Sequence, residues 1–295
     1  MNSNHALPLL TTLTAAAIAA GCAAPPEMLG PPGKEEIVAV SVSNHLLRFN
    51  AGQPQNTRDR RPLQGLRSDD KIVGIDYRVA RGELFVLGSS GQLYKVDVAQ
   101  ARASAVGSGV ELPAAANEWG FDFNPTVDRI RVVNNSGANL RLHPDTGAIV
   151  DSDPAAPGVQ LDGRLAYDAA DINAGKTAGV VAAGYTYNKT NDKITTNYAL
   201  DGTWGLLVHQ GSKEGVAPLV SPNTGRVFTV GSLGVGPFAH ATFDISDLNN
   251  TAYAGLRNAG AKATRWHRID LATGKATFIG TVGGGEALVG ATIAP

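Results

Sequence analysis

Residues 120–130, GFDFNPTVDRI, form the segment that decides the fold, because three other segments repeat its pattern. Each copy has an aromatic or aliphatic residue, a small polar residue, a second apolar residue, a turn and then a strand. The copies are IDYRVARGEL (75–84), YTYNKTNDKI (185–194) and FDISDLNNTA (243–252). Repeats of about 40 to 60 residues with about four strands each are typical of propeller blades.

A second set of segments predicts tight turns, each with a glycine where the backbone needs a positive φ. These segments are HPDTGAIV (143–150), SPNTGRVF (221–228) and DLATGKAT (270–277). Between such turns the chain has short runs rich in Val, Ile, Leu, Tyr and Phe, while helical periodicity is nearly absent. The sequence therefore predicts an all-β protein.

The C-terminal segment ALVGATIAP (287–295) matches the opening of two repeats, yet no blade follows it. Residues 37–66, in contrast, supply strands without such an opening. We therefore expect the C-terminal strand to complete the N-terminal blade, because this closure removes two exposed sheet edges. The prediction is a single β-propeller of five blades, with a sixth blade inside 178–236 as the alternative. The blades are 37–66 with 287–295, 71–110, 118–164, 178–236 and 239–285.

Composition limits the function. Hydrophobic residues make up 43% of the 295-residue chain, enough to bury a sizeable core. The 25 Lys and Arg against 26 Asp and Glu give a net charge of −1, which argues against a nucleic-acid partner. The single cysteine excludes an intramolecular disulfide and a zinc site made of several thiolates.

That cysteine follows a short apolar run. Residues 6–20 have the length of a signal-peptide core, and Ala19-Ala20-Gly21 precedes Cys22. This pattern resembles the bacterial lipobox, although Ala19 replaces the usual Leu and no Lys or Arg precedes the run. We predict a lipoprotein signal peptide at 1–21, a lipidated Cys22 with a Pro-rich tether at 22–36, and the propeller at 37–295. An ordinary secretory signal cut near Ala24 is the alternative.

The same reading predicts the location and the partners. The chain would be exported and held at the lipid bilayer through Cys22, and Ala23, which is not the inner-membrane retention residue Asp, favours an outer-membrane lipoprotein. Cleavage near Ala24 would instead give a soluble periplasmic or secreted protein. We expect a monomer whose further partner is a ligand or an envelope protein.

Several segments together resemble a known family. GFDFNPTVDRIRVVNNSGANLRLHPDTGAIV (120–150), VVAAGYTYN (180–188) and GRVFTVGSLG (225–234) are similar to the bacterial domain of unknown function 4394. The resemblance covers nearly the whole chain after the leader. It implies a secreted, propeller-like protein without an assigned activity, so no catalytic residue carries over.

Known catalytic and nucleotide-binding motifs are missing from the sequence: it has no P-loop, GxSxG elbow, HExxH or strict EF-hand loop. The six histidines are not spaced as metal ligands. Only His240 is expected near the mouth of the pore, where we favour a hydrogen-bonded structural role.

One set of aligned residues is a candidate ligand or metal site. The repeats place five residues at the same position of the five innermost strands: Asp76, Asp122, Thr186, Asp244 and Thr292. Carboxylates and hydroxyls converging on the pore axis would suit Ca²⁺. In the alternative, which we favour, each Asp turns away from the axis and accepts backbone N–H bonds from a neighbouring loop, and no cofactor is bound.

A second candidate is the long link at 151–179, which carries Asp168 and Asp171 among other acidic residues. Long loops on propellers often form the binding face, but a solvated segment that covers a blade edge is an equal alternative.

Two functions follow from these observations. We favour a non-enzymatic ligand- or protein-binding module at the cell envelope. A cation-dependent, lactonase-like propeller hydrolase is the alternative, since propellers host both.

Overall fold

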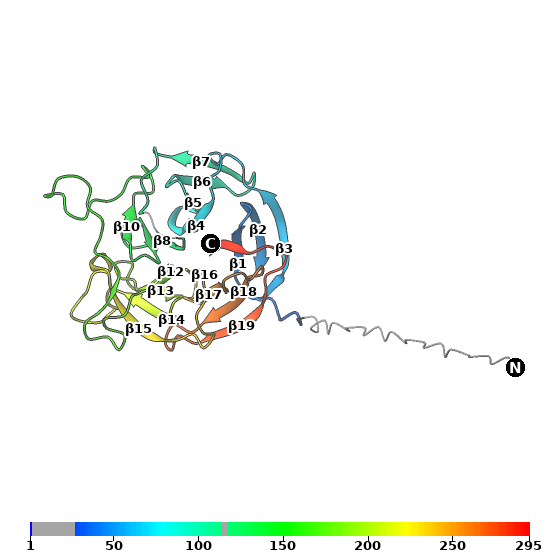
Figure 1. Ribbon diagram of the computed structural model, residues 1–295. Helices are drawn as coiled ribbons and strands as arrows, with labels where there is room; N and C mark the ends of the chain where they lie inside the picture. Colours follow the sequence, from blue (N-terminus) through cyan, green and yellow to red (C-terminus); the bar gives the residue numbers. More distant parts are fainter. Residues whose placement is uncertain (2–26, 114–116) are drawn as a thin grey trace.

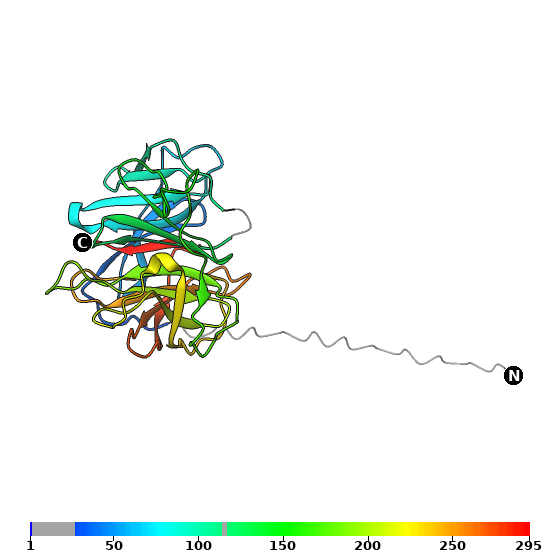
Figure 2. The same cartoon turned by 90° about the vertical axis from the view of Figure 1, so that its left-hand side faces the viewer.

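The computed structural model describes residue 1 and residues 27–113 and 117–295. In the described residues the strands form five small antiparallel sheets, which stand around a central axis like the blades of a propeller. Figure 1 looks down this axis and shows the C-terminus at the centre of the ring. Figure 2 shows the same ring from the side. The prediction of a five-bladed all-β propeller is confirmed, and the stretch 178–236 forms one blade, not two.

The blades follow one another along the chain, and each except the first begins with its innermost strand, apart from a short edge strand that precedes blade 4. Blade 1 contains β1 (Glu36–Ser41), β2 (His45–Asn50), β3 (Gln53–Pro62) and β20 (Leu288–Ile293). Blade 2 contains β4 (Ile72–Arg78), β5 (Glu83–Gly88), β6 (Leu93–Asp97) and β7 (Arg102–Val106). Blade 3 contains β8 (Trp119–Asn124), β9 (Arg129–Asn134) and β10 (Asn139–Leu142).

The last two blades differ in their outer edges. Blade 4 contains β12 (Val180–Tyr185), β13 (Asn197–Asp201), β14 (Leu206–Gln210), β15 (Arg226–Ser232) and β11 (Ala166–Tyr167). Blade 5 contains β16 (His240–Ile245), β17 (Ala252–Arg257), β18 (Arg265–Ile269) and β19 (Ala276–Thr281). The short β11 pairs with β15 in parallel, so part of the 151–179 link covers the outer edge of blade 4.

The ring closes where the two ends of the propeller pair. Strand β20 runs antiparallel to β1 in a register that places Ile293 opposite Ile37 and Ala291 opposite Ala39. The C-terminal strand is therefore the innermost strand of blade 1, as the sequence predicted, and the N-terminal strand does not expose an unpaired edge toward the axis.

The core is divided among the five junctions between blades. Each hydrophobic cluster joins residues of two adjacent blades, as when Val38 and Leu46 of blade 1 pack with Val86 and Tyr94 of blade 2. Near the axis the innermost strands approach closely, and a Cβ on Gly74 would stand 2.4 Å from the Cβ of Phe121. A glycine at this position is thus favoured by the close approach, and it recurs as Gly120, Gly184 and Gly290, whereas blade 5 has Thr242 there. No helix among the described residues is long and apolar enough to span a membrane.

Candidate functional site

Three of the aligned acidic residues meet at the propeller axis. Asp76 on β4, Asp122 on β8 and Asp244 on β16 each offer a carboxylate oxygen, and these three oxygens lie within 4.8 Å of one another. All three side chains are buried. The favoured expectation that each Asp turns away from the axis is therefore wrong: equivalent positions of the closed ring bring the three aspartates together, and their oxygens are ligands that suit a hard cation.

Each of these carboxylates also fastens its blade to the next one. The backbone N–H that it accepts comes from the innermost strand of the neighbouring blade, not from a loop. The bonds run from Phe123 N to Asp76 Oδ2 (2.7 Å), from Tyr185 N to Asp122 Oδ1 (3.0 Å) and from Ile293 N to Asp244 Oδ2 (2.6 Å). Convergence on the axis and bonding to backbone amides, which the sequence analysis treated as alternatives, thus occur together.

Thr292 on β20 completes this group. Its hydroxyl lies 2.8 Å from Oδ1 of Asp76 and 2.9 Å from Oδ2 of Asp244. A hydroxyl has one proton, so it can donate to only one of the two carboxyl groups. The other contact is a hydrogen bond only when that carboxyl group itself carries a proton and donates it to Thr292.

The electrostatics of the axis favour such protonation. Burial together with the neighbouring Asp244 charge raises the pKa of Asp76 well above its usual value. Burial and the charges of Asp76 and Asp244 do the same to the pKa of Asp122. Burial raises the pKa of Asp244 to about 6, although three hydrogen bonds to its carboxylate oppose the shift. Like charges in a dry site therefore resist full ionisation unless a cation or protons offset them.

The remaining aligned residue, Thr186, takes no part in this hydrogen-bonded group. Its hydroxyl donates to Glu214 of the β14–β15 loop and accepts the N–H of Thr196 at 2.8 Å. The junction between blades 4 and 5 is made instead by Asn250, which reaches back to Tyr187. The Asn250 amide accepts the Tyr187 N–H at 2.8 Å and donates to the Tyr187 carbonyl at 3.0 Å.

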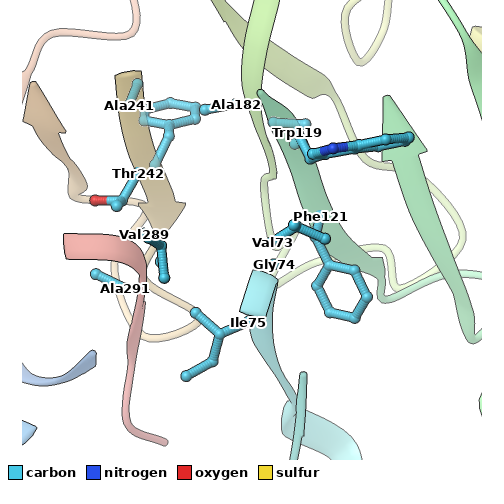
Figure 3. Close-up of a pocket in the computed structure, with 14 residues that line it drawn as sticks. Val73, Gly74, Ile75, Trp119, Phe121, Ala182, Ala241, Thr242, Val289 and Ala291 are labelled. Carbon is cyan, nitrogen blue, oxygen red and sulfur yellow. The ribbon is translucent and has the colours of Figure 1, made fainter. Parts of the chain in front are cut away.

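The space along the axis is very small. On the N-terminal side of the carboxylates, residues of all five innermost strands enclose a cavity of about 20 Å³, room for about one water molecule. Figure 3 shows that the labelled side chains around it are nearly all apolar, including Val73, Phe121 and Val289. The axial cavity therefore has room for an ion or a water but not for an organic substrate.

A titratable pair lies beside this cavity, on the residues that precede Trp119 and Ala241 of its wall. The Nδ1 of His240 contacts the carboxylate of Glu118. Burial raises the pKa of Glu118 to about 7, against the opposing charge of Arg257. Burial and Arg257 lower the pKa of His240. The structural role expected for His240 is compatible with this contact. The sequence analysis did not identify Glu118, because this residue lies just before a strand and belongs to no known motif.

The large pocket of the molecule lies off the axis, and the sequence analysis missed it. It has a volume of about 550 Å³ and lies between blades 3 and 4 (green to yellow in Figure 1). Its walls come from the β8–β9 turn, from β9 and β10, and from the β12–β13 and β14–β15 loops. We call it the blade 3–4 pocket. A volume of this size and a lining that mixes apolar and polar groups are typical of small-molecule sites.

Two arginines form one wall of the blade 3–4 pocket. Arg131 on β9 and Arg141 on β10 stand directly opposite each other in the strand register. Both donate to the buried Asp162 of the 151–179 link, Arg131 through Nη1 at 2.5 Å and Arg141 through Nε and Nη2 at 2.8 Å each. The RIR and LRL segments could have revealed this pair, because a hairpin places such residues side by side. Their common partner comes from a distant link, which no local pattern indicates.

The two secondary loop candidates hold the link in place. Asp168 accepts the N–H of Ala170 at 2.9 Å and the Nε–H of Arg226 at 2.5 Å. Asp171 accepts both the backbone N–H and the hydroxyl of Thr229, at 2.7 and 2.8 Å. Their carboxylates bind the link to β15. This part of the link therefore covers the edge of blade 4, which was the second of the two alternatives for it. The lipidation candidate, Cys22, lies outside the described residues.

Fold and site together define a five-bladed β-propeller that is closed by its C-terminal strand and fastened by carboxylates around its axis. The chain belongs to the family described as Domain of unknown function (DUF4394), whose model matches residues 45–292. The resemblance noted in the sequence is thereby confirmed. None of the curated proteins matches the chain.

Solved structures resemble the chain in fold only. The chain is similar to a nidogen/laminin complex (11% identity, TM-score 0.47), with 89% of this chain and 99% of that chain covered. A structural genomics protein of unknown function from Bacteroides thetaiotaomicron gives 13% identity and a TM-score of 0.44, covering 84% and 58%. A putative 6-phosphogluconolactonase from Bacteroides uniformis gives 11% and 0.40, covering 84% and 82%.

Proposed function

We propose that the protein is a non-catalytic binding module that takes a small ligand in the blade 3–4 pocket. One observation carries the proposal: the blade 3–4 pocket lies away from the axis and has a volume of about 550 Å³, which is room for an organic molecule. The axial cavity, where a propeller hydrolase would activate water, has about 20 Å³. A small-molecule site needs a few hundred Å³ and several convergent polar groups, which the blade 3–4 pocket offers.

The alternative function is a cation-dependent hydrolase, and the axial carboxylates favour it to a limited extent. Asp76, Asp122 and Asp244 could hold a cation such as Ca²⁺, which would polarise a substrate oxygen. Against this, five of their six carboxylate oxygens already accept a hydrogen bond from the chain. We therefore assign the carboxylates a structural role, in which shared protons offset the repulsion.

A calcium titration separates the two roles of the axis. If the carboxylates hold Ca²⁺, the melting temperature of the protein must rise with calcium and fall with chelator, because a ligand of the native state stabilises it. We expect no change with either addition. A calcium-dependent rise that is lost in Asp122→Asn would favour the hydrolase.

The binding function is tested with a set of small cationic, neutral and anionic compounds added to the full chain. We expect one class to shift the NMR signals of residues in the β12–β13 and β14–β15 loops, which line the pocket. If no compound of any class shifts these signals, the proposed function is wrong.

The location of this binding module is a further part of the proposal. We propose that the protein is exported and held at the cell envelope, in the outer membrane where the host has one, by a lipid on Cys22. Mass spectrometry should find a mature N-terminus at Cys22 with acyl chains, and Cys22→Ser should release the protein from the membrane fraction. An unmodified N-terminus at Ala24 or later would show a soluble secreted protein.

A further inference from the structure

We infer that the blade 3–4 pocket selects a small organic anion with hydroxyl groups, an inference that rests on the proposed binding function. The ligand would bind through its carboxylate or phosphate to the basic wall of the pocket. Its hydroxyl groups would donate to an acceptor that the protein leaves without a partner. The charge of the wall, the unpaired acceptor and the lining of the entrance support this class independently.

The first observation is an excess of positive charge in the wall. The guanidinium groups of Arg131 and Arg141 share the single carboxylate of Asp162, and Arg131 is only 1% exposed. The other donors of Arg131 go to uncharged acceptors, the Tyr185 hydroxyl and the Asn139 and Asn223 amide oxygens. Two cations against one anion leave one positive charge without an ion-pair partner among the described residues. An arginine in this setting suits a carboxylate or a phosphate.

The second observation is a buried acceptor without a donor. Asn197 on β13 lines the pocket and is 1% exposed, and its Oδ1 has no hydrogen-bond partner among the described residues. Its other amide atom, Nδ2, donates to Gln210 Oε1 at 3.2 Å. A buried acceptor without a donor is unfavourable, so a ligand hydroxyl that donates to it gains affinity.

The orientation of this amide is fixed by its neighbours. Gln210 donates through Nε2 to the Asn139 Oδ1 at 3.0 Å and to the Pro222 carbonyl at 2.7 Å, so its Oε1 must face Asn197. Asn139 is oriented in turn by Arg131, which donates to its Oδ1 at 2.8 Å. The amide oxygen of Asn197 therefore remains the free acceptor, and the same network joins it to the basic wall.

The third observation concerns the entrance of the pocket. Three further basic side chains line it, Arg129, Lys193 and Lys213, and no ion pair to a described acidic residue holds any of them. One acidic residue, Glu214, is also in the lining, and it accepts from Thr186 and Asn188. Five basic residues against Glu214 and the nearby Asp162 leave an excess of three positive charges. This field attracts anions to the pocket and disfavours cations.

The test uses three probes with six carbons each. Gluconate carries a carboxylate and hydroxyls, sorbitol only hydroxyls, and hexanoate only a carboxylate. We expect calorimetry on the full chain to detect gluconate, with hexanoate and sorbitol each about tenfold weaker or undetectable, the loss of about one strong hydrogen bond. Glucose 6-phosphate, measured in parallel, shows whether the wall prefers a phosphate to a carboxylate.

Variants locate the binding. Arg141→Met removes the surplus charge while Arg131 still pairs with Asp162, and it should weaken gluconate about tenfold or more. Because this side chain is partly buried, the double variant Lys193→Met with Lys213→Met provides a second test at the entrance and should also weaken gluconate. The matched control is Arg58→Met in blade 1, whose arginine forms an exposed pair with Glu36 and should leave binding unchanged.

The outcomes separate the ligand class from the binding function. Equal affinity for sorbitol and gluconate, or pocket shifts caused only by neutral or cationic compounds, would overturn the anion class while the binding function stands. Equal weakening of gluconate by Arg58→Met would show nonspecific attraction and also overturn it. Absence of any shift in the pocket, with all probes and compounds, would overturn both.

Discussion

The propeller axis and the blade 3–4 pocket are both built on charged side chains, yet they differ in every other respect. The axis brings together three carboxylates beside a cavity of about 20 Å³. The pocket brings together two guanidinium groups and one carboxylate beside a space of about 550 Å³. The axial residues occupy equivalent positions of the repeat, whereas Asp162 and much of the pocket wall belong to links and loops outside it. In this propeller the repeated residues hold the blades together at the axis, and the links and loops that differ between blades form much of the candidate site.

The junctions between blades show the same contrast within the axis itself. Where the repeat keeps its aspartate, as at Asp76 and Asp122, the carboxylate binds the next strand directly. Blade 4 has Thr186 at this position, and its hydroxyl turns to Glu214 at the edge of the blade 3–4 pocket. Asn250 makes the junction with blade 5 instead. Of the two blades with threonine at this position, blades 1 and 4, blade 4 is thus the one that helps to form the pocket.

The largest loss of stability is expected when the strand that closes the ring is removed and the sequence of blades 3 and 4 is left unchanged. Deleting residues 288–295 removes β20, and with it the pairing to β1 and the Thr292 and Ile293 bonds to the carboxylates. We expect a chain that is unfolded or aggregated, as measured by circular dichroism and size-exclusion chromatography. Removing Pro295 alone, beyond the strand, is the control and should have no effect. A monomeric truncated chain with the melting temperature of the full chain would show that closure does not hold the ring.

The next largest effect is expected at the wall of the pocket. Asp162→Asn leaves Arg131 and Arg141 side by side without a carboxylate, and we expect unfolding in urea to show a loss of about 3 kcal/mol. Asp153→Asn, in an exposed part of the same link, should change stability by less than about 0.5 kcal/mol. Equal stability of the two variants would mean that the arginine pair needs no internal anion.

A smaller effect is expected at the one junction without an axial carboxylate. Asn250→Gly keeps a residue that tolerates the positive φ of 57° but removes both bonds to Tyr187. We expect a loss of about 1–2 kcal/mol in urea unfolding. Asn258→Gly, at an exposed turn of the same blade, is the control for the added flexibility. If both variants lose the same stability, the Asn250 bonds do not fasten blades 4 and 5.

The smallest effect at neutral pH, and the most specific, is expected for Asp122→Asn. The raised pKa values of the axial carboxyl groups mean that the folded state binds more protons than the unfolded state above about pH 4, so stability falls as pH rises. The amide cannot ionise, and it keeps an oxygen for the Tyr185 N–H. We expect the variant to be no more stable than the natural chain at pH 5 but more stable by about 1 kcal/mol at pH 8.

The measurement for this variant is urea unfolding between pH 5 and pH 8. Glu118, whose pKa is raised to about 7, is present in both chains, so the difference between the two profiles reports on the axis. Asp97→Asn, an exposed aspartate of blade 2, is the control and should give a profile parallel to that of the natural chain. A parallel profile for Asp122→Asn would mean that the axial carboxyl groups ionise freely.

Much of the fold could be predicted from the sequence, because the same pattern of strand and turn residues recurs in several copies. The GFDFNPTVDRI segment and its copies identified the innermost strands, and the unpaired opening at 287–295 identified the closure. The same alignment placed Asp76, Asp122 and Asp244 at equivalent positions of the ring, but it did not decide whether they face the axis, where the structure brings them together. The sequence could not predict that each carboxylate accepts an N–H from the innermost strand of a neighbouring blade, because this contact depends on how closely the blades pack.

The sequence by itself thus determined the repeat, the closing strand and the equivalent positions of the aligned aspartates, whereas the structure decided five blades over six and the meeting of the carboxylates at the axis. The features that the sequence determined depend on local periodicity and on the alternation of side chains along a strand, and both patterns are present in each copy of the repeat. Only the tertiary structure decided that Asp162 lies between Arg131 and Arg141, that Asn197 keeps a free acceptor, and that the largest pocket lies between blades 3 and 4. The physical reason is that these contacts join segments far apart in sequence, whose positions are set by the packing of two blades and the path of one long link.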